Sequence, residues 1–190
     1  MEHPLSQFRY CPKCGSEHFD IHNEKSKQCK DCGFVYYFNP SSASVALILN
    51  KQNELLVCRR AKEPAKGTLD LPGGFIDMAE TGEEGVAREV KEETGLTLTS
   101  YKLRGLVTFI SDKCEPELMC VFTANEYIGE LTECNEGELY WIDKAVVPTL
   151  PTWEGDRVFL DLLLSGDERF FSLKLQYEGE KLVDKQVNLY

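Results

Sequence analysis

The clearest periodic pattern in the chain is a helical one near its middle. Thr81 followed three residues later by Glu84 is a capping-box signature, and Gly95 stands where a helix would end. At about 100° per residue, Val86 and Val90 fall in one less polar sector. We therefore predict a helix between Thr81 and Gly95 that buries this sector.

Strands are predicted on both sides of this helix. Apolar runs and period-two alternation mark the segments 44–49, 54–60, 97–110 and 117–127. An amphipathic segment, 153–164, predicts a second helix that covers one face of the resulting sheet. Strands interleaved with helices indicate the α/β class with a mixed sheet.

The end of the chain predicts a β-hairpin. Phe171, Leu173, Leu175 and Tyr177 alternate strictly with polar residues, and the turn at 178–180 follows them. A hairpin added to a complete domain has an edge strand to cover. We expect it to pack on the N-terminal part of the chain or on a second subunit, which would make the protein a homodimer.

Four cysteines form two knuckles near the N-terminus. Cys11 pairs with Cys14 and Cys29 with Cys32, each as Cys-x-x-Cys followed by glycine, with fourteen residues between the pairs. Four thiolates at this spacing suit tetrahedral Zn²⁺ in a closed structural site. Two disulfides or a redox-active pair are the alternatives. We predict a structural zinc ribbon.

Three parts of the chain are expected from these patterns. Residues 1–38 form the lead and the zinc ribbon, and Pro40 with the serines after it marks the first boundary. Residues 39–166 form the main domain, and 167–190 form the C-terminal hairpin.

Composition limits the classes of function. The 190 residues carry a net charge of −11, which argues against a nucleic-acid partner because such proteins normally show a basic stripe. No apolar run is long enough to span a bilayer, and the first residues do not resemble a secretory signal. We therefore expect no membrane partner and a cytoplasmic location, where Cys-x-x-Cys pairs favour metal over disulfide.

The predicted helix carries glutamates on one face. Glu89, Glu92 and Glu93 fall within roughly one third of the helix circumference. Like charges at this spacing cost roughly 0.2–0.5 kcal/mol per pair in an isolated helix, so we expect a cation there. Carboxylate oxygens favour Mg²⁺ or Mn²⁺ over zinc.

The motif around this helix resembles the Nudix box of the Nudix hydrolase family. Gly74, five residues, Glu80, seven residues and then the run from Arg88 to Leu96 match it at every fixed position. Such a match arises by chance in roughly one window in a billion. A solvated acidic helix is the alternative. The resemblance implies an α/β/α sandwich around a mixed sheet, and hydrolysis of a nucleoside diphosphate linked to another group.

The resemblance also assigns roles to residues. It implies that Glu89, Glu92 and Glu93 are metal ligands, with Glu93 bound most closely to the catalytic ion, and that the Gly73 carbonyl is a further ligand. Arg88 is expected to orient these carboxylates by an ion pair.

The proton acceptor is less well defined by the sequence. In the family it often comes from a later loop, and Glu136 before a glycine is our first choice. Glu138 is the next choice, and Glu92 or Glu93 remain alternatives. Glu80 is expected to position the loop before the helix.

The substrate is a nucleotide-type small molecule by the same resemblance. Arg59 and Arg60 follow a predicted strand and either bind its anionic groups or form a solvated basic loop. The ribbon resembles that of the NADH pyrophosphatase branch, but its Ser-Gln-Pro-Trp-Pro-Phe run has no match at 106–113. ADP-ribose or a nucleotide sugar is therefore favoured over NADH, and a damaged nucleoside triphosphate stays open.

Two functions from other classes are also weighed. One is a catalytically silent module that senses a nucleotide, which the complete set of helix glutamates disfavours. The other is a nucleic-acid adaptor that binds through the ribbon, where lysines and acidic residues offset one another.

Overall fold

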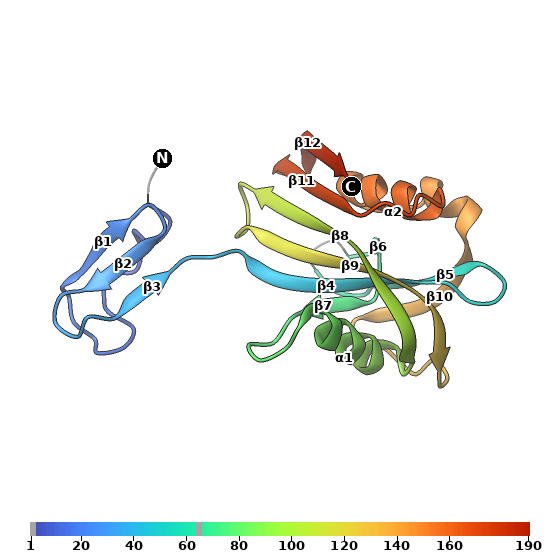
Figure 1. The fold of residues 1–190 in the computed structure, drawn as a ribbon, viewed down its shortest axis with the longest axis horizontal. Coiled ribbons are helices and arrows are strands. Elements are labelled where there is room, and N and C mark those ends of the chain that lie inside the picture. The colour runs from blue at the N-terminus through green and yellow to red at the C-terminus, as the bar shows by residue number, and fades with distance from the viewer. Residues whose placement is uncertain (1–2, 64–65) are drawn as a thin grey trace. The chain divides into compact units, whose positions relative to one another are not determined.

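The computed structural model describes residues 3–63 and 66–190. The chain forms two compact units, residues 1–40 and 41–190, which we describe separately (Figure 1). No helix among the described residues is long and apolar enough to cross a membrane.

The first unit is a small antiparallel sheet. Its strands are β1 (Phe19–Asn23), β2 (Ser26–Cys29) and β3 (Val35–Tyr37), with β2 in the centre. Cys11, Cys29 and Phe19 are buried together with Phe34 packed against them. This core is small, and two of the four ribbon cysteines belong to it.

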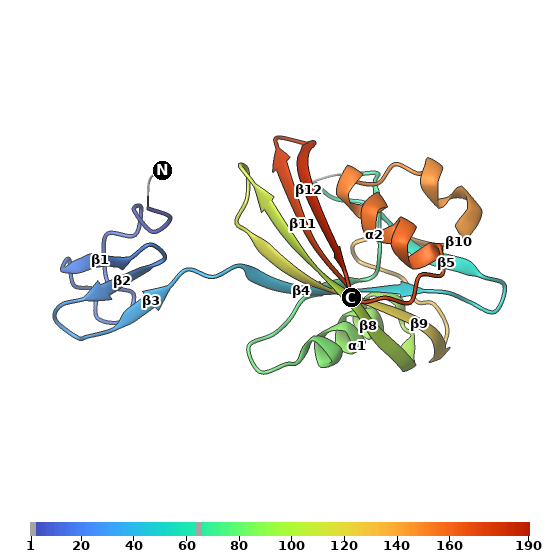
Figure 2. The same ribbon diagram turned by 45° about the horizontal axis from the view of Figure 1, so that its top comes forward.

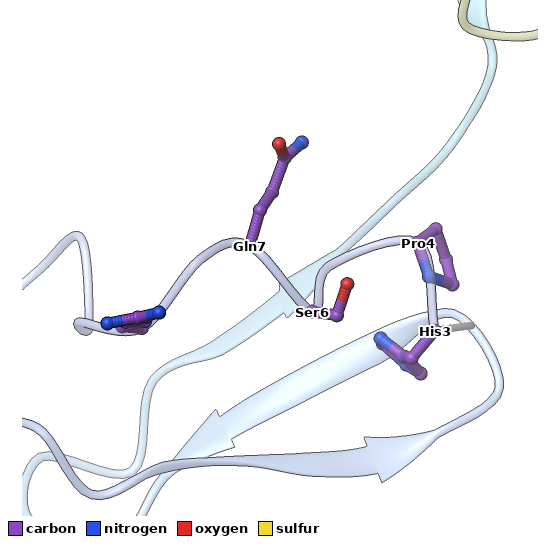
Figure 3. Close-up of a pocket in the computed structure, with 5 residues that line it drawn as sticks. His3, Pro4, Ser6 and Gln7 are labelled. Atoms are coloured by element: carbon purple, nitrogen blue, oxygen red, sulfur yellow. The ribbon is translucent and has the colours of Figure 1, made fainter.

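The lead before the ribbon is attached to it through His3. The His3 ring donates a hydrogen bond to the Asn23 carbonyl at 2.9 Å, and Leu5 is fully buried. Figure 3 shows the hollow beside this contact, which His3, Pro4, Ser6, Gln7 and Arg9 line. Among the described residues that line it there is no carboxylate, which is the ligand that Mg²⁺ and Mn²⁺ prefer.

Among its described residues the second unit contains two sheets, two α-helices and one 3₁₀ helix. In chain order its elements are β4 (Ser41–Ile48), β5 (Glu54–Arg60), β6 (Leu69–Asp70), β7 (Gly73–Phe75), α1 (Gly82–Thr94), β8 (Thr97–Ser111), β9 (Glu117–Ile128), β10 (Gly137–Asp143), a 3₁₀ helix (Lys144–Thr149), α2 (Glu154–Leu164), β11 (Phe171–Glu178) and β12 (Lys181–Leu189). The larger sheet has the order β12-β11-β8-β9-β4-β7, and the smaller has the order β10-β5-β6. Parallel pairing of β4 with β9 and of β8 with β11 makes the larger sheet mixed.

The helices cover opposite faces of the larger sheet (Figures 1 and 2). Ile48 of β4 packs in one cluster with Val90 of α1, whereas Leu47 packs in another with Phe159 of α2. Neighbouring residues of a strand point to opposite faces, so β4 contributes to both cores. The predicted α/β/α sandwich is confirmed.

The C-terminal hairpin differs from the extension that the sequence suggested. β11 pairs in parallel with β8, with Phe171 opposite Gly105, and it lies in the same compact unit as the rest of residues 41–190 (Figure 2). A Cβ on Gly105 would lie 2.2 Å from the Phe171 ring, so this glycine makes room for it. The Tyr177 hydroxyl accepts a hydrogen bond from the Gly155 N–H at 2.7 Å. The alternating residues of β11 therefore complete the main core.

β12 is the edge of the larger sheet. It pairs with β11, and its side chains are mostly exposed. Contact of this edge with a second subunit stays a prediction.

Removal of the Phe171 ring tests whether β11 belongs to the core. We expect Phe171→Ala to lower the free energy of unfolding by about 3–5 kcal/mol, because the side chain is only 1% exposed. Both tryptophans lie in the second unit, so their fluorescence during urea unfolding reports on it. Val183→Ala, at a position 42% exposed, is the control and should change stability by about 0.5 kcal/mol or less. Equal effects of the two substitutions would contradict this account.

Candidate active site

Helix α1 begins and ends where its local sequence dictates. The Thr81 hydroxyl accepts from the Glu84 N–H at 3.2 Å, and the Glu84 carboxylate accepts from the Thr81 N–H at 2.8 Å. Gly95 ends the helix with φ of 79°, and its N–H donates to the Lys91 carbonyl at 3.0 Å. A Cβ on Gly95 would also lie 2.7 Å from the Glu130 carbonyl oxygen, so only glycine fits.

Two glycines allow the turn before the helix to approach the acidic face of α1. The Gly73 N–H donates to the Glu93 carboxylate at 3.0 Å. Gly73 has φ of 153°, and a Cβ on it would lie 2.1 Å from the Ser44 carbonyl oxygen. A Cβ on Gly74 would lie 2.7 Å from the Glu89 carboxyl carbon. Larger residues at either position would displace the carboxylates or the strand.

Arg88 links this turn to the helix. Its guanidinium donates to both Glu80 oxygens, at 2.7 and 2.9 Å, and to Glu89 at 2.7 Å. It also donates to the Phe75 carbonyl at 2.9 Å and reaches Glu92 at 3.4 Å. The bond from Arg88 lowers the pKa of Glu80 to about 2, and the carboxylates raise the pKa of Arg88. Arg88 therefore forms ion pairs with Glu80 in the loop and with Glu89 on the helix, and its role in orienting the carboxylates stays a prediction.

Glu93 is a mostly buried carboxylate of α1 whose pKa is raised. Burial, together with the charges of Glu136, Glu89 and Asp70, raises its pKa to about 7, against the hydrogen bond from the Gly73 N–H, which lowers it. Glu92, in contrast, is 63% exposed. The carboxylates of Glu136, Glu89 and Asp70 thus lie near enough to Glu93 to raise its pKa, and acidic groups accumulate around it.

Glu136 acts on Glu93 from another element, the loop between β9 and β10. It directly precedes β10, and its carbonyl accepts from the Ala61 N–H at 2.8 Å. A Cβ on Gly137 would lie 1.9 Å from the Arg59 carbonyl oxygen, so glycine is required for β10 to pair with β5 there. The charge of Glu136, our first-choice proton acceptor, contributes to the raised pKa of Glu93, and its role as the acceptor stays a prediction.

Glu138 and the two arginines are placed differently. Glu138 lies opposite Arg59 in the ladder, and it accepts a hydrogen bond from the Tyr140 hydroxyl. The Arg59 guanidinium lies over the Tyr140 ring, 5.2 Å from its centroid. Arg60 forms an ion pair with Asp70 at 2.9 Å. Both arginines therefore contact other groups of the protein. Of the two, Arg60 is the one paired with Asp70, whose charge raises the pKa of Glu93.

Sequence reasoning missed two acids, Asp70 and Asp156. Asp70 raises the pKa of Glu93, and it also adds to the effect of burial that raises the pKa of Asp156 to about 7. Asp70 directly precedes the Leu-Pro-Gly-Gly run, and Asp156 lies in the first turn of α2. Neither residue belongs to a recognisable ligand spacing. The only signal in the sequence was the position of Asp70 directly before the Leu-Pro-Gly-Gly run.

The ribbon cysteines converge in a second, separate cluster. The Sγ atoms of Cys11 and Cys32 are 3.7 Å apart, those of Cys14 and Cys29 are 3.6 Å apart, and all four lie within 4.8 Å of one another. All four are free thiols, and the Cys32 N–H lowers the pKa of Cys29 to about 6. A single four-thiolate cluster fits one Zn²⁺ and does not fit two disulfides within the Cys-x-x-Cys pairs.

The carboxylates of α1 fit a hard divalent cation. Glu89 shares Oε1 with Arg88 and Glu93 shares Oε2 with the Gly73 N–H, which leaves one oxygen of each without a protein donor among the described residues. Oxygen ligands of this kind are those that Mg²⁺ and Mn²⁺ prefer. The cation would offset the charge that accumulates around Glu93.

Comparison with known families agrees with this geometry. The family model of the NUDIX domain matches residues 39–163, which is more than half of the chain. The model of the NADH pyrophosphatase zinc ribbon domain matches residues 6–37.

Individual proteins are similar to parts of the chain. An NAD-capped RNA hydrolase, NudC, from Vibrio vulnificus is 30% identical over 129 residues, which is 68% of this chain and 48% of NudC. The chain spans about half the length of several such curated relatives. An ADP-ribose pyrophosphatase from Methanocaldococcus jannaschii is 50% identical over 70 residues, 37% of this chain and 41% of that protein.

A solved structure supports the same assignment. The crystal structure of a MutT protein from Bacillus halodurans superimposes with a TM-score of 0.71 at 25% identity, and the match covers 78% of this chain and 97% of that one. The fold, the helix motif and the family model agree, and the chain therefore belongs to the Nudix hydrolase family.

Proposed function

We propose that this chain hydrolyses the pyrophosphate bond of a nucleoside diphosphate linked to another group, and that ADP-ribose or a nucleotide sugar is the favoured substrate. The observation that carries the proposal is the packing of the Gly73–Gly74 turn against two carboxylates of α1: the Gly73 N–H donates to Glu93 at 3.0 Å, and a Cβ on Gly74 would lie 2.7 Å from the Glu89 carboxyl carbon. The 50% identity to an ADP-ribose pyrophosphatase over 70 residues supports the substrate class.

Each residue of the site has a proposed role. Glu89, Glu92, Glu93 and the Gly73 carbonyl would hold Mg²⁺ or Mn²⁺. When bound, the cation neutralises phosphate oxygens and acidifies the attacking water.

The protein's other groups then position the reaction. Arg88 keeps the Glu89 carboxylate in place through its 2.7 Å bond, so that little reorganisation is needed at the moment of attack. Glu136, whose carboxylate acts on Glu93 from a separate element, would accept the proton of the water. Arg60, fixed by Asp70, supports the anionic substrate from the side of β5.

A dinucleotide substrate is the second candidate. The ribbon matches a domain model from NADH pyrophosphatases, and several relatives are named NAD-capped RNA hydrolases. An NAD-type pyrophosphate, free or at the end of an RNA, is therefore the alternative. The prediction that nucleic acid is not a partner is tested by including such an RNA.

One assay separates these candidates. The zinc-loaded protein is incubated with Mg²⁺ and ADP-ribose, nucleotide sugars, NADH, NAD-capped RNA or nucleoside triphosphates, and products are identified by mass. We expect ADP-ribose or a nucleotide sugar to give the highest kcat/KM, with a nucleoside monophosphate among the products. Highest turnover of NADH or capped RNA would favour the second candidate. No turnover of any substrate would favour the silent sensor.

Replacement of Glu93 tests its role in catalysis. We expect Glu93→Gln to lower kcat by about 10³-fold or more, because a metal-binding carboxylate is lost. The fold should persist, since a neutral amide replaces a carboxylate whose charged form burial disfavours. Glu178→Gln, an exposed position on the hairpin, is the matched control and should retain wild-type turnover. Near-wild-type kcat in Glu93→Gln would refute the assignment.

The raised pKa of Glu93 predicts how metal and pH act on stability. The folded metal-free protein keeps this proton up to about pH 7, whereas the unfolded chain releases it near the ordinary value of 4.5. Stability should therefore fall as pH rises from about 4.5 to about 7, by on the order of 2 kcal/mol, and then level off. Mg²⁺ binds the deprotonated form, so it should raise Tm at pH 8 and much less at pH 5.

Thermal unfolding with and without Mg²⁺ checks this dependence. Chelators are avoided because they would also remove zinc from the ribbon. Glu93→Gln should lose both the pH-dependent decline and most of the Mg²⁺ effect. Equal Mg²⁺ shifts in wild type and variant, or equal shifts at both pH values, would contradict it.

A further inference from the structure

Two cysteines outside the ribbon meet beside the acidic cluster. Cys58 lies on β5 and is only 6% exposed, and Cys134 lies half-buried in the loop between β9 and β10. Their Sγ atoms are 4.0 Å apart, although 76 positions separate them in the chain. Both are free thiols.

The pair lies between two parts of the proposed active site. A Cβ on Gly137 would lie 2.9 Å from the Cys58 Sγ, so the start of β10 packs directly over this thiol. The charges of Glu93 and Asp70 also act on Cys58, where they add to the burial that raises its pKa to about 12. Cys134 stands two positions before Glu136. The thiols therefore connect the surroundings of Glu93 with the loop that carries Glu136.

We propose that Cys58 and Cys134 are a modification site, an oxidisable dithiol that closes to a disulfide and ties the loop of Glu136 to β5. Its effect on turnover rests on the proposed function, but formation of the disulfide does not. In a reducing compartment such a bond is transient and suits redox control.

A peroxide is the oxidant that the chemistry requires. The more accessible thiol, Cys134, attacks the O–O bond as thiolate, forms a sulfenic acid and releases water or an alcohol. The Cys58 sulfur then attacks the sulfenic sulfur, which forms the S–S bond and releases a second molecule of water. The two thiols lose two electrons and two protons, the peroxide gains them, and a dithiol reductant reverses the reaction.

Closure of the bond requires movement of the loop. The S–S bond length is about 2.05 Å, so the sulfur atoms must approach by about 2 Å. β5 is held on both sides by β10 and β6, whereas Cys134 lies outside any strand. Cys134 and its neighbours outside the strands therefore move toward β5, and this movement pulls on Glu136, two positions later, against the hydrogen bond that its carbonyl accepts from the Ala61 N–H. Because a misplacement of about 1 Å can reduce a rate by about 10²-fold, we expect oxidation to lower kcat by about 10–100-fold.

Peroxide treatment of the full zinc-loaded chain tests the proposal. Hydrogen peroxide is added, free thiols are alkylated, and digested peptides are mapped by mass, while a chromogenic chelator reports zinc released from the ribbon. We expect a cross-linked peptide that joins Cys58 to Cys134, a 10–100-fold loss of kcat, and recovery of both with dithiothreitol.

A matched variant separates this pair from the ribbon cysteines. Cys134→Ser should retain basal turnover, form no such cross-link, and resist peroxide at doses that release no zinc. Cys134→Ala provides a second test if the serine variant does not fold. The proposal would be overturned if peroxide oxidised Cys134 to a sulfinic acid without forming the cross-link to Cys58. It would also be overturned if peroxide inactivated wild type and Cys134→Ser equally. A reversible cross-link in a protein that hydrolyses none of the substrates supports the modification site and counts against the proposed function.

Discussion

The close approach of the Gly73–Gly74 turn to the acidic face of α1 is the constraint on which the site depends. The turn donates a backbone N–H to Glu93 at 3.0 Å, and the absence of a side chain at Gly74 leaves room for Glu89. The capping box and Gly95 fix the helix, and its apolar face packs on β4. Arg88 joins the loop to the helix and balances one side of the carboxylate cluster. On the side toward Glu93, a divalent cation would offset the charge of the carboxylates once Glu93 is deprotonated.

The rest of the unit brings distant acids to this point. Pairing of β10 with β5 and of β5 with β6 carries Glu136 and Asp70 to the same helix. Parallel pairing of β11 with β8 completes the core on the opposite face, where α2 packs. The helix supplies the carboxylates that we propose bind the metal, while the small sheet supplies the acids whose positions depend on long-range strand pairing. The loop with Cys134 belongs to this second group, which is why a change in it would act on Glu136.

The local parts of this arrangement could be predicted from sequence. The capping box, Gly95 and the spacing of Glu89, Glu92 and Glu93 all act within one helix, and the cysteine knuckles act within one ribbon. Strict alternation also predicted β11 as a strand. Its neighbour β8 was not predictable, because alternation identifies a buried face and does not identify the partner strand. Asp70 and Cys58 were missed for the same reason: their roles come from residues far away in the chain.

Binding of Mn²⁺, followed by the electron paramagnetic resonance of the free ion, tests the central claim most directly. We predict a specific site in the zinc-loaded chain that the double substitution Glu89→Gln with Glu93→Gln removes. Gly74→Ala should weaken binding although it alters no carboxylate, since its Cβ would lie 2.7 Å from the Glu89 carboxyl carbon. Equal binding of Mn²⁺ by wild type and the double variant would contradict the account.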